Sequence, residues 1–223
     1  MRDKQLRGIV ARWTRGMWPV GIVAGCAAVW ATAGSSPAAV EIGQKAPEFS
    51  ELAGVDGRNH SLADYAEAKA IVLVFTCNHC PVSQAYEDRL IALQKDFKEK
   101  GVQVLAVNPN CPQKVPEDNF ENMQKRAAGN DLGNWRDTKE PFNFPYLVDA
   151  TQEVARAYGA TSTPHVFLLD QQRNVAYMGA IDDNMAPTYV KQPFVRRALE
   201  AVLNGNPPET PATTALGCMI VWK

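Results

Sequence analysis

Two cysteines separated by two residues stand where an apolar run gives way to a helical pattern. The run covers residues 70–75, Cys77 and Cys80 follow it, and apolar residues repeat at helical spacing from Tyr86 to Phe97. A helix N-terminus presents free N–H groups and the positive end of its dipole, which favour a thiolate at the leading sulfur. Because the thiolate is the attacking species in disulfide exchange, the spacing predicts Cys77 as the nucleophile, with a pKa below the free value of about 8.5, and Cys80 as the resolving cysteine.

A histidine lies between the two cysteines. His79 can place a proton or a positive charge near Cys77, and stabilising the reduced, ionised form makes the oxidised form a better oxidant. Asn78 and His79 therefore favour an oxidising or isomerising couple. A structural zinc site would need a second pair of cysteine or histidine ligands, which the sequence lacks at matching spacing, and a structural disulfide across so short a loop would add little stability. We predict Cys77, Cys80 and His79 as catalytic residues, with no metal and no cofactor.

The first 33 residues have the pattern of an export signal. Basic residues from Arg2 to Arg15 precede an apolar stretch over residues 16–33, which ends in the small-x-small cleavage pattern Ala31-Thr32-Ala33. Removing this segment takes five of the 23 basic residues and one of the 24 acidic residues, so the net charge becomes about −5. An acidic balance without a basic face argues against nucleic-acid binding. We expect the catalytic domain in the periplasm or cell envelope, where a disulfide exchanger has substrates.

One cysteine inside the signal offers an alternative. The run Val23-Ala24-Gly25-Cys26 resembles a bacterial lipobox, in which the cysteine is lipidated and becomes the new N-terminus. Apolar residues continue past Cys26 to Trp30, as in an ordinary signal core. Lipidation at Cys26, ordinary cleavage before Gly34 and an uncleaved membrane anchor are therefore three alternatives for the N-terminus.

Hydrophobic patterning beyond the cysteine pair predicts a strand-helix-strand unit. Apolar runs over residues 70–75 and 102–107 flank a helical segment that ends at Gly101, so two parallel strands lie in one sheet. A long insertion over residues 108–144 follows, with a helix that starts at Pro116. An insertion longer than a connector needs is typical of a segment that shapes the rim of a site.

Turn and capping residues predict shorter elements on either side of this unit. Asp56-Gly57 is a hairpin turn signal, and we expect His60 after it to be exposed. Residues 149–152 have the pattern of a capping box that opens a short helix, and Gly159 closes it.

The last third of the chain predicts a hairpin, a helix and a tail. Thr163-Pro164 opens a strand over residues 166–169, which a polar turn connects to a second strand over 175–178. A final helix covers about residues 193–205. The sequence therefore divides into an export signal (1–33), one domain (34–205) and a C-terminal tail (206–223).

This order of elements resembles the thioredoxin fold over about residues 40–205. The resemblance implies an α/β domain with a central mixed sheet flanked by helices, extended by an N-terminal hairpin and by the insertion. In that family the proline matching Pro164 is cis, and its loop lies against the two sulfurs and binds the substrate backbone. The resemblance thus implies that Thr163 and Pro164 contact the substrate, and we add Asn78 to this set.

Further motifs are similar to the redoxin branch of this superfamily, the AhpC/TSA family. The resemblance covers nearly all of the chain after the signal, and the motifs that carry it are Gly43-x-x-Ala46-Pro47-x-Phe49, residues 75–81, residues 86–90, residues 145–147 and Gly217-Cys218-x-Ile220-x-Trp222-Lys223. It implies an exported thiol-disulfide oxidoreductase that acts on protein or small-molecule thiols and disulfides.

Two other functions remain as alternatives. The first is a thiol peroxidase. Peroxiredoxins carry Pro-x-x-x-Thr-x-x-Cys, and neither Cys77 nor Cys80 is preceded by that threonine and proline. Peroxide consumption by the purified protein would identify this function. Copper-chaperone relatives use Cys-x-x-x-Cys-Pro with a distant histidine, and Pro81 and His165 match part of that pattern. A copper titration would recognise this second alternative, a copper-handling or redox-sensing protein without turnover.

Two cysteines remain, and both are candidate redox residues. Cys111 follows the strand of residues 102–107, at the sheet edge where Cys77 is expected, and the apolar side chains of Ile220 and Trp222 favour docking of the tail that carries Cys218. Three arrangements are open: the two cysteines are distant and Cys218 is free on a mobile tail, they form a disulfide worth about 4–5 kcal/mol for so long a loop, or Cys218 reaches Cys77 and Cys80 as a third redox cysteine.

Overall fold

The computed structural model describes residues 39–130 and 140–223. The predicted export signal, with Cys26 and the cleavage pattern at residues 31–33, lies outside these ranges, as does part of the insertion. Within them, none of the helices combines the length and the apolar character that crossing a membrane requires.

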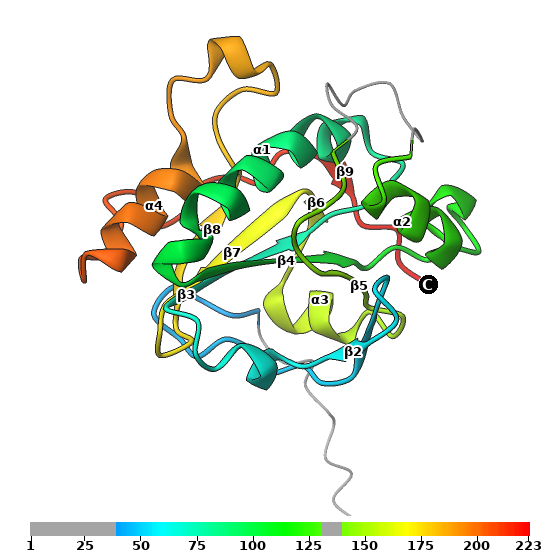
Figure 1. Ribbon diagram of the computed structural model, residues 1–223, viewed down its shortest axis with the longest axis horizontal. Coiled ribbons are helices and arrows are strands. Elements are labelled where there is room, and N and C mark those ends of the chain that lie inside the picture. The colour runs from blue at the N-terminus through cyan, green and yellow to red at the C-terminus, as the bar shows by residue number, and fades with distance from the viewer. Residues whose placement is uncertain (1–38, 131–139) are drawn as a thin grey trace, which may run out of the picture. The chain divides into compact units, whose positions relative to one another are not determined.

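A mixed sheet of seven strands forms the centre of the domain, in the order β2-β1-β5-β4-β3-β7-β8 (Figure 1). The predicted strand-helix-strand unit is confirmed, because β3 pairs with β4 in parallel, and the predicted hairpin is the antiparallel pair of β7 and β8. The strands are β1 (Leu52–Gly54), β2 (Asn59–His60), β3 (Ala70–Phe75), β4 (Val102–Asn108), β5 (Tyr146–Val148), β7 (His165–Leu169) and β8 (Val175–Gly179).

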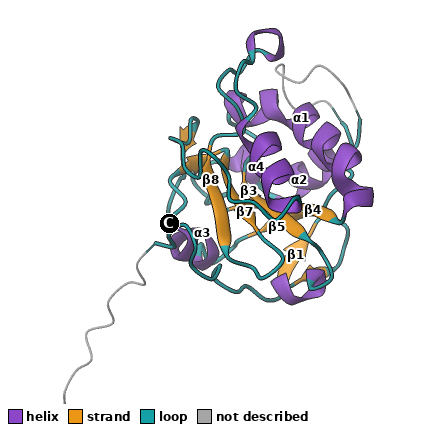
Figure 2. Cartoon of the chain, turned by 90° about the vertical axis from the view of Figure 1, so that its left-hand side faces the viewer, coloured by secondary structure: helices purple, strands orange, loops and turns teal. Residues whose placement is uncertain are grey.

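Helices cover both faces of this sheet (Figure 2). α1, α2 and α4 pack on one face, while α3 and the segment before β1 pack on the other. Alternate residues of β3 enter the two cores: Val72 and Val74 face α1, and Leu73 and Phe75 face α3. A strand buried on both faces needs a continuous apolar sequence, which β3 has. The helices are α1 (Pro81–Phe97), α2 (Phe120–Ala127), α3 (Glu153–Tyr158) and α4 (Phe194–Leu203), with short 3-10 turns at η1 (Leu62–Tyr65), η2 (Lys98–Lys100), η3 (Pro116–Asp118) and η4 (Pro187–Tyr189).

The start of α3 differs from the prediction. The N-cap is Gln152, in a left-handed conformation with φ 65, and no capping box forms. The Asp149 carboxylate instead accepts the N–H of Ala155 at 2.8 Å, inside the helix. Gly159, with φ 69, ends the helix as predicted, because a residue without a Cβ adopts this conformation most readily.

His60 is buried, so the prediction of an exposed residue is wrong. Its side chain lies between the hairpin turn and η1: Nδ1 is 2.6 Å from the Tyr65 hydroxyl, and Nε2 is 3.0 Å from Asp56. The predicted hairpin itself is present, with β1 and β2 paired around Gly57. Two polar partners make the burial of the imidazole tolerable.

The C-terminal tail packs against the domain. Its strand β9 (Cys218–Met219) lies beside β6 (Ser162–Thr163) (Figure 1). The two strands pair antiparallel, with Thr163 opposite Cys218. Ile220 is buried in the core on the α3 face. Docking of the tail through its apolar residues is therefore confirmed, and the alternative in which Cys218 is free on a mobile tail is wrong.

Candidate active site

The cysteine pair lies between the end of β3 and the start of α1. The loop over residues 76–80 is tied to the sheet because the Thr76 N–H donates to the Val107 carbonyl of β4 at 2.9 Å. α1 begins at Pro81, so Cys80 is its N-cap residue and Cys77 precedes the helix. Both cysteines are buried, with 1% and 0% of their surface exposed.

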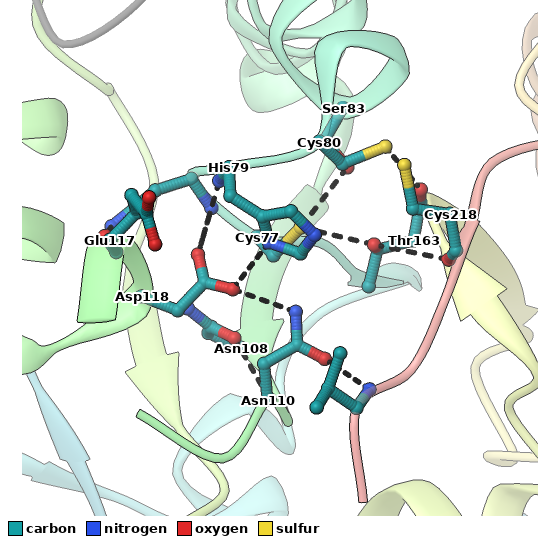
Figure 3. A network of polar contacts seen from close by, with 12 residues as sticks. Cys77, His79, Cys80, Ser83, Asn108, Asn110, Glu117, Asp118, Thr163 and Cys218 are labelled. Atoms are coloured by element: carbon teal, nitrogen blue, oxygen red, sulfur yellow. Dashed lines mark hydrogen bonds and ion pairs between the residues drawn. The ribbon is translucent and has the colours of Figure 1, made fainter. Parts of the chain in front are cut away.

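Thr163 connects the two sulfurs, and the peptide bond between Thr163 and Pro164 is cis. The Thr163 Oγ1 lies 3.0 Å from Cys77 Sγ, and the Thr163 carbonyl oxygen lies 3.2 Å from Cys80 Sγ (Figure 3). The antiparallel pairing of β3 with β7 brings these loops together, since Phe75 lies opposite His165. The expected cis proline, with its loop against both sulfurs, is confirmed.

The two thiols differ in acidity, and in the opposite sense to the prediction. Burial raises the pKa of Cys77 well above its ordinary value, and the hydrogen bond to Cys80 and the charge of Asp118 raise it further. The hydrogen bond from Cys77 lowers the pKa of Cys80 to about 4, against the effect of burial, and Cys218 adds a second such bond. The N-cap position also exposes Cys80 to the positive end of the α1 dipole. The predicted low pKa at Cys77 is therefore wrong, and Cys80 is the sulfur held as thiolate.

A buried carboxylate, which sequence reasoning missed, holds His79. The Asp118 side chain accepts from His79 Nδ1 at 2.7 Å and from Asn110 Nδ2 at 2.7 Å, and it also accepts the backbone N–H groups of Asn78 and His79 (Figure 3). The hydrogen bond to Asp118 raises the pKa of His79. Burial by itself would raise the pKa of Asp118, but the hydrogen bonds, led by that of His79, lower it. When His79 is protonated, its positive charge is paired with the Asp118 carboxylate, which offsets its effect on Cys77.

No spacing rule links Asp118 to the cysteine motif. It lies in η3, on the insertion that follows β4, 40 residues from Asn78. The one signal in the sequence was the length of this insertion, which predicted a segment at the rim of a site. Its position confirms that expectation, although the residue type was not anticipated.

Asn78 supports the loop from inside. Its side chain is buried: Nδ2 donates to the Glu117 carbonyl at 2.9 Å, and Oδ1 accepts from the Tyr146 hydroxyl at 3.0 Å. Its carbonyl accepts from Gln84 of α1 at 2.6 Å. In this position the side chain holds the loop against β5 and η3, and its contact with a substrate stays a prediction.

His165 is also turned inward. Burial lowers its pKa to about 4, and Nδ1 accepts the N–H of Thr161 at 3.3 Å. Among the residues that the structure describes, the cysteine, histidine and acidic side chains close enough to share a metal ion are Cys77, His79 and Asp118, with ligand atoms within 4.8 Å of one another. His165 is not in this group, so the histidine of the copper alternative would be His79.

The two remaining cysteines lie in different surroundings. Cys111 is buried, and its thiol donates to Gln113 Oε1 at 3.2 Å. Cys218 is partly exposed, and its thiol contacts that of Cys80 (Figure 3). Burial and this contact raise the pKa of Cys218 to about 12. Cys77, Cys80, Cys111 and Cys218 form no disulfide here, and Cys218 lies as in the third arrangement left open by the sequence.

A family model and two curated relatives match the part of the chain that holds this site. The model of the AhpC/TSA family matches residues 42–178. Thiol-disulfide oxidoreductase ResA of Geobacillus thermodenitrificans is 30% identical over 140 residues, 61% of this chain and 68% of that protein. A Mycobacterium tuberculosis protein, named as a candidate peroxiredoxin, is 33% identical over 122 residues, 53% of this chain and 63% of that protein.

Solved structures are similar over most of the chain. A conserved protein from Geobacillus kaustophilus has a TM-score of 0.72 at 37% identity, covering 82% of this chain and 93% of that one. A candidate thiol:disulfide interchange protein DsbE from Chlorobium tepidum has a TM-score of 0.52 at 23% identity, covering 75% and 98%. The second likeness concerns the fold alone, and it confirms the predicted mixed sheet with flanking helices.

Proposed function

This chain belongs to the AhpC/TSA family, and we propose that it is an exported thiol-disulfide oxidoreductase that works through the Cys77/Cys80 couple. The observation that carries the proposal is the placement of both sulfurs against Thr163, beside the cis proline. The name of the ResA relative points to the same activity. Export is proposed from the basic and apolar pattern of residues 1–33.

In the reducing direction, Cys80 is the attacking sulfur. Its thiolate attacks one sulfur of a substrate disulfide, a Cys80–substrate bond forms, and the other substrate sulfur leaves as a thiolate. Cys77 then loses its proton and attacks Cys80 Sγ, which closes the Cys77–Cys80 disulfide and releases the second substrate thiol. The substrate gains the two electrons that the cysteines lose, together with the proton of Cys77 and one proton from solvent. The reverse sequence oxidises a substrate dithiol.

His79 and Asp118 are placed to handle the proton of Cys77. Their polar atoms and Cys77 Sγ lie within 4.8 Å of one another, and the raised pKa of His79 keeps a proton available when Cys77 leaves as a thiolate. The Thr163 hydroxyl, 3.0 Å from the same sulfur, can donate to it. These groups therefore act on Cys77, whose thiolate is less stable than that of Cys80.

The first test replaces each cysteine of the couple by serine. We expect the purified protein to reduce insulin disulfides in the presence of dithiothreitol, and Cys77→Ser and Cys80→Ser each to lower this rate by at least about a hundredfold. Cys111→Ser is the matched control, because Cys111 is buried and hydrogen-bonded elsewhere, and its rate should stay that of the unmodified protein. Equal rates for all four proteins would contradict the proposal.

A thiol peroxidase is the second candidate, and the mycobacterial relative favours it. In that reaction a cysteine thiolate attacks a peroxide oxygen, becomes a sulfenic acid and condenses with the second cysteine. Hydrogen peroxide consumption that is as fast as disulfide exchange and is lost in Cys80→Ser would favour this function. A copper titration of the reduced protein tests the Cys77, His79 and Asp118 group in the same samples.

A further inference from the structure

The C-terminal tail runs as a strand along the loop that carries the cis proline. β9 pairs with β6 so that Cys218 lies opposite Thr163, the residue that contacts both active sulfurs. Gly217 lies so close that a Cβ there would be 2.0 Å from the Thr163 carbonyl oxygen and 2.9 Å from the Pro164 nitrogen. A residue with a side chain could not occupy this position without moving the tail, so the glycine permits the approach of Cys218.

The residues after Cys218 hold the strand in this register. The Val221 N–H donates to Asn110 Oδ1 at 2.8 Å, and its carbonyl accepts the Cys111 N–H at 3.0 Å. Ile220 is buried, and the Arg156 guanidinium lies 4.2 Å above the Trp222 ring. The tail is therefore anchored on the side away from Gly217 as well, and Cys218 has little freedom to turn from the site.

Asn110 also joins the tail to the catalytic histidine. Its amide nitrogen donates to Asp118 at 2.7 Å, and its amide oxygen accepts from the tail at Val221. Asp118 in turn binds His79 at 2.7 Å. The strand that carries Cys218 and the group that serves Cys77 therefore share one hydrogen-bond network (Figure 3).

The three cysteines at the site differ in their exposure to solvent. Cys77 and Cys80 are 1% and 0% exposed, whereas Cys218 is partly exposed. Figure 3 shows Cys218 directly beside Cys80, on the side of Thr163 where the tail runs. A thiol group on another molecule would therefore meet Cys218 before it could reach the buried pair.

We propose that Cys218 is a third redox residue, which relays disulfide exchange between external thiols and the buried Cys77/Cys80 couple. This proposal rests on the thiol-disulfide exchange proposed above. In this arrangement the tail of the chain itself occupies the position at the cis-proline loop that a substrate strand would take.

Each relay step moves one disulfide bond. Starting from the Cys77–Cys80 disulfide, the Cys218 thiolate attacks Cys80 Sγ, the Cys80–Cys218 bond forms, and Cys77 leaves and takes up a proton in place of the one that Cys218 lost. An external thiolate then attacks Cys218 Sγ and frees Cys80, and a second external thiolate displaces Cys218. The external dithiol loses two electrons and two protons, and the three protein cysteines end as thiols. The reverse order reduces an external disulfide.

The first experiment traps the intermediate in the full chain. Cys77→Ser cannot close the buried disulfide, so treatment with oxidised glutathione should produce a Cys80–Cys218 bond, identified by peptide mass mapping. Glutathione attached to Cys80 while Cys218 stays a free thiol would overturn the proposal. A urea midpoint close to that of the unmodified protein establishes that the variant is folded. Cys80→Ser under the same treatment is the matched control, because it cannot form the Cys80–Cys218 bond.

The second experiment measures the relay by rate. We expect Cys218→Ser to slow reduction of the Cys77–Cys80 disulfide by reduced glutathione by at least about tenfold, because an intramolecular attacking group is lost. Met219→Ala changes the neighbouring residue, which is 81% exposed, and should leave the rate unchanged. Gly217→Ala, which displaces Cys218 without removing it, should slow the reaction as Cys218→Ser does.

Two results separate the alternatives. If Cys218→Ser reacts as fast as the unmodified protein while Gly217→Ala reacts faster, the tail is only a cover, and the relay is overturned while the proposed function stands. If the unmodified protein neither forms the Cys77–Cys80 disulfide nor exchanges it with glutathione, the proposed function itself fails. Slowing in both variants, with exchange intact in the unmodified protein, supports both.

Discussion

At the scale of single residues, the hydrogen bonding and the charge of the site depend on Asp118, which lies outside the cysteine motif. It is fully buried and receives hydrogen bonds from two side chains and from two backbone N–H groups of the cysteine loop. A buried carboxylate is stable only with such partners, and its charge in turn holds the imidazolium of His79. The acidities in the site therefore depend on a network and not on the sequence motif alone.

Replacement of Asp118 gives a prediction with a defined pH dependence. The raised pKa of folded His79 contributes stability that is complete below the unfolded value of 6.5 and is lost as the pH rises through the folded pKa. The lowered pKa of folded Asp118 contributes stability above 3.8 that is lost as the pH falls through its folded pKa. Both contributions are complete between these two values. We expect Asp118→Asn to lower the free energy of unfolding by at least about 2 kcal/mol at pH 5, and by less at pH 9.

Urea unfolding of both proteins at the two pH values measures this difference. Glu121→Gln is the control, because Glu121 is an exposed carboxylate whose pKa is lowered by Lys125 alone among side chains. A loss that is the same at pH 5 and pH 9 would show that Asp118 acts only by packing.

At the scale of secondary structure, the point where α1 begins determines which sulfur is acidic. The sequence pattern placed both cysteines at the helix start, but Pro81 is the first helical residue, and the N-cap position therefore falls on Cys80. Cys77 lies in the preceding loop, surrounded by buried groups and near a carboxylate. Burial and like charge disfavour a thiolate there.

The thiolate of Cys80 should be visible in a pH titration. The reduced protein should keep a thiolate absorbance near 240 nm as the pH falls, with a midpoint of about 4, and Cys80→Ser should lose this component. Cys111→Ser should keep it, which controls for loss of an unrelated buried thiol. A midpoint near the ordinary value of 9.0 in the unmodified protein would contradict the assignment of Cys80 as the attacking sulfur.

At the scale of the described domain, the chain from β1 to α4 builds the site and the tail then returns to complete it. The contacts of β9 with β6 join residues 55 positions apart, and those of Val221 with Asn110 join residues 111 apart. Such pairings close long loops, so they form only when side chains buried at the same place offset the entropy of closure. Ile220 is the buried side chain that does so for the tail.

Shortening Ile220 should therefore release the tail while the domain stays folded. We expect Ile220→Ala to weaken docking by about 2 kcal/mol, which is roughly a thirtyfold faster hydrogen exchange of the tail amides if exchange follows opening of the tail. Hydrogen exchange read by mass spectrometry on the last peptide measures this directly. Met219→Ala, at an exposed position of the same strand, should leave exchange unchanged, and equal exchange in Ile220→Ala would show that the tail is held by its polar contacts.

Local patterns in the sequence were sufficient for the fold and for the location of the site. The period of the apolar residues placed β3, α1, β4 and the β7–β8 hairpin, and turn residues placed their ends, because these features depend on neighbours within a few positions. The order of those elements and the Thr163-Pro164 pair also led to the cis-proline loop beside the cysteines, through the resemblance that they support.

Contacts between distant residues were needed for the chemistry within that site. Which sulfur is acidic depends on burial and on Asp118, and the inward turn of Asn78 depends on Tyr146, 68 positions away. The position of Cys218 depends on the pairing of β9 with β6, which joins residues 55 positions apart. Charge, burial and hydrogen bonding act through space, so residue types and spacing identified the groups of this site but not their roles, which follow from the neighbours that folding brings to each.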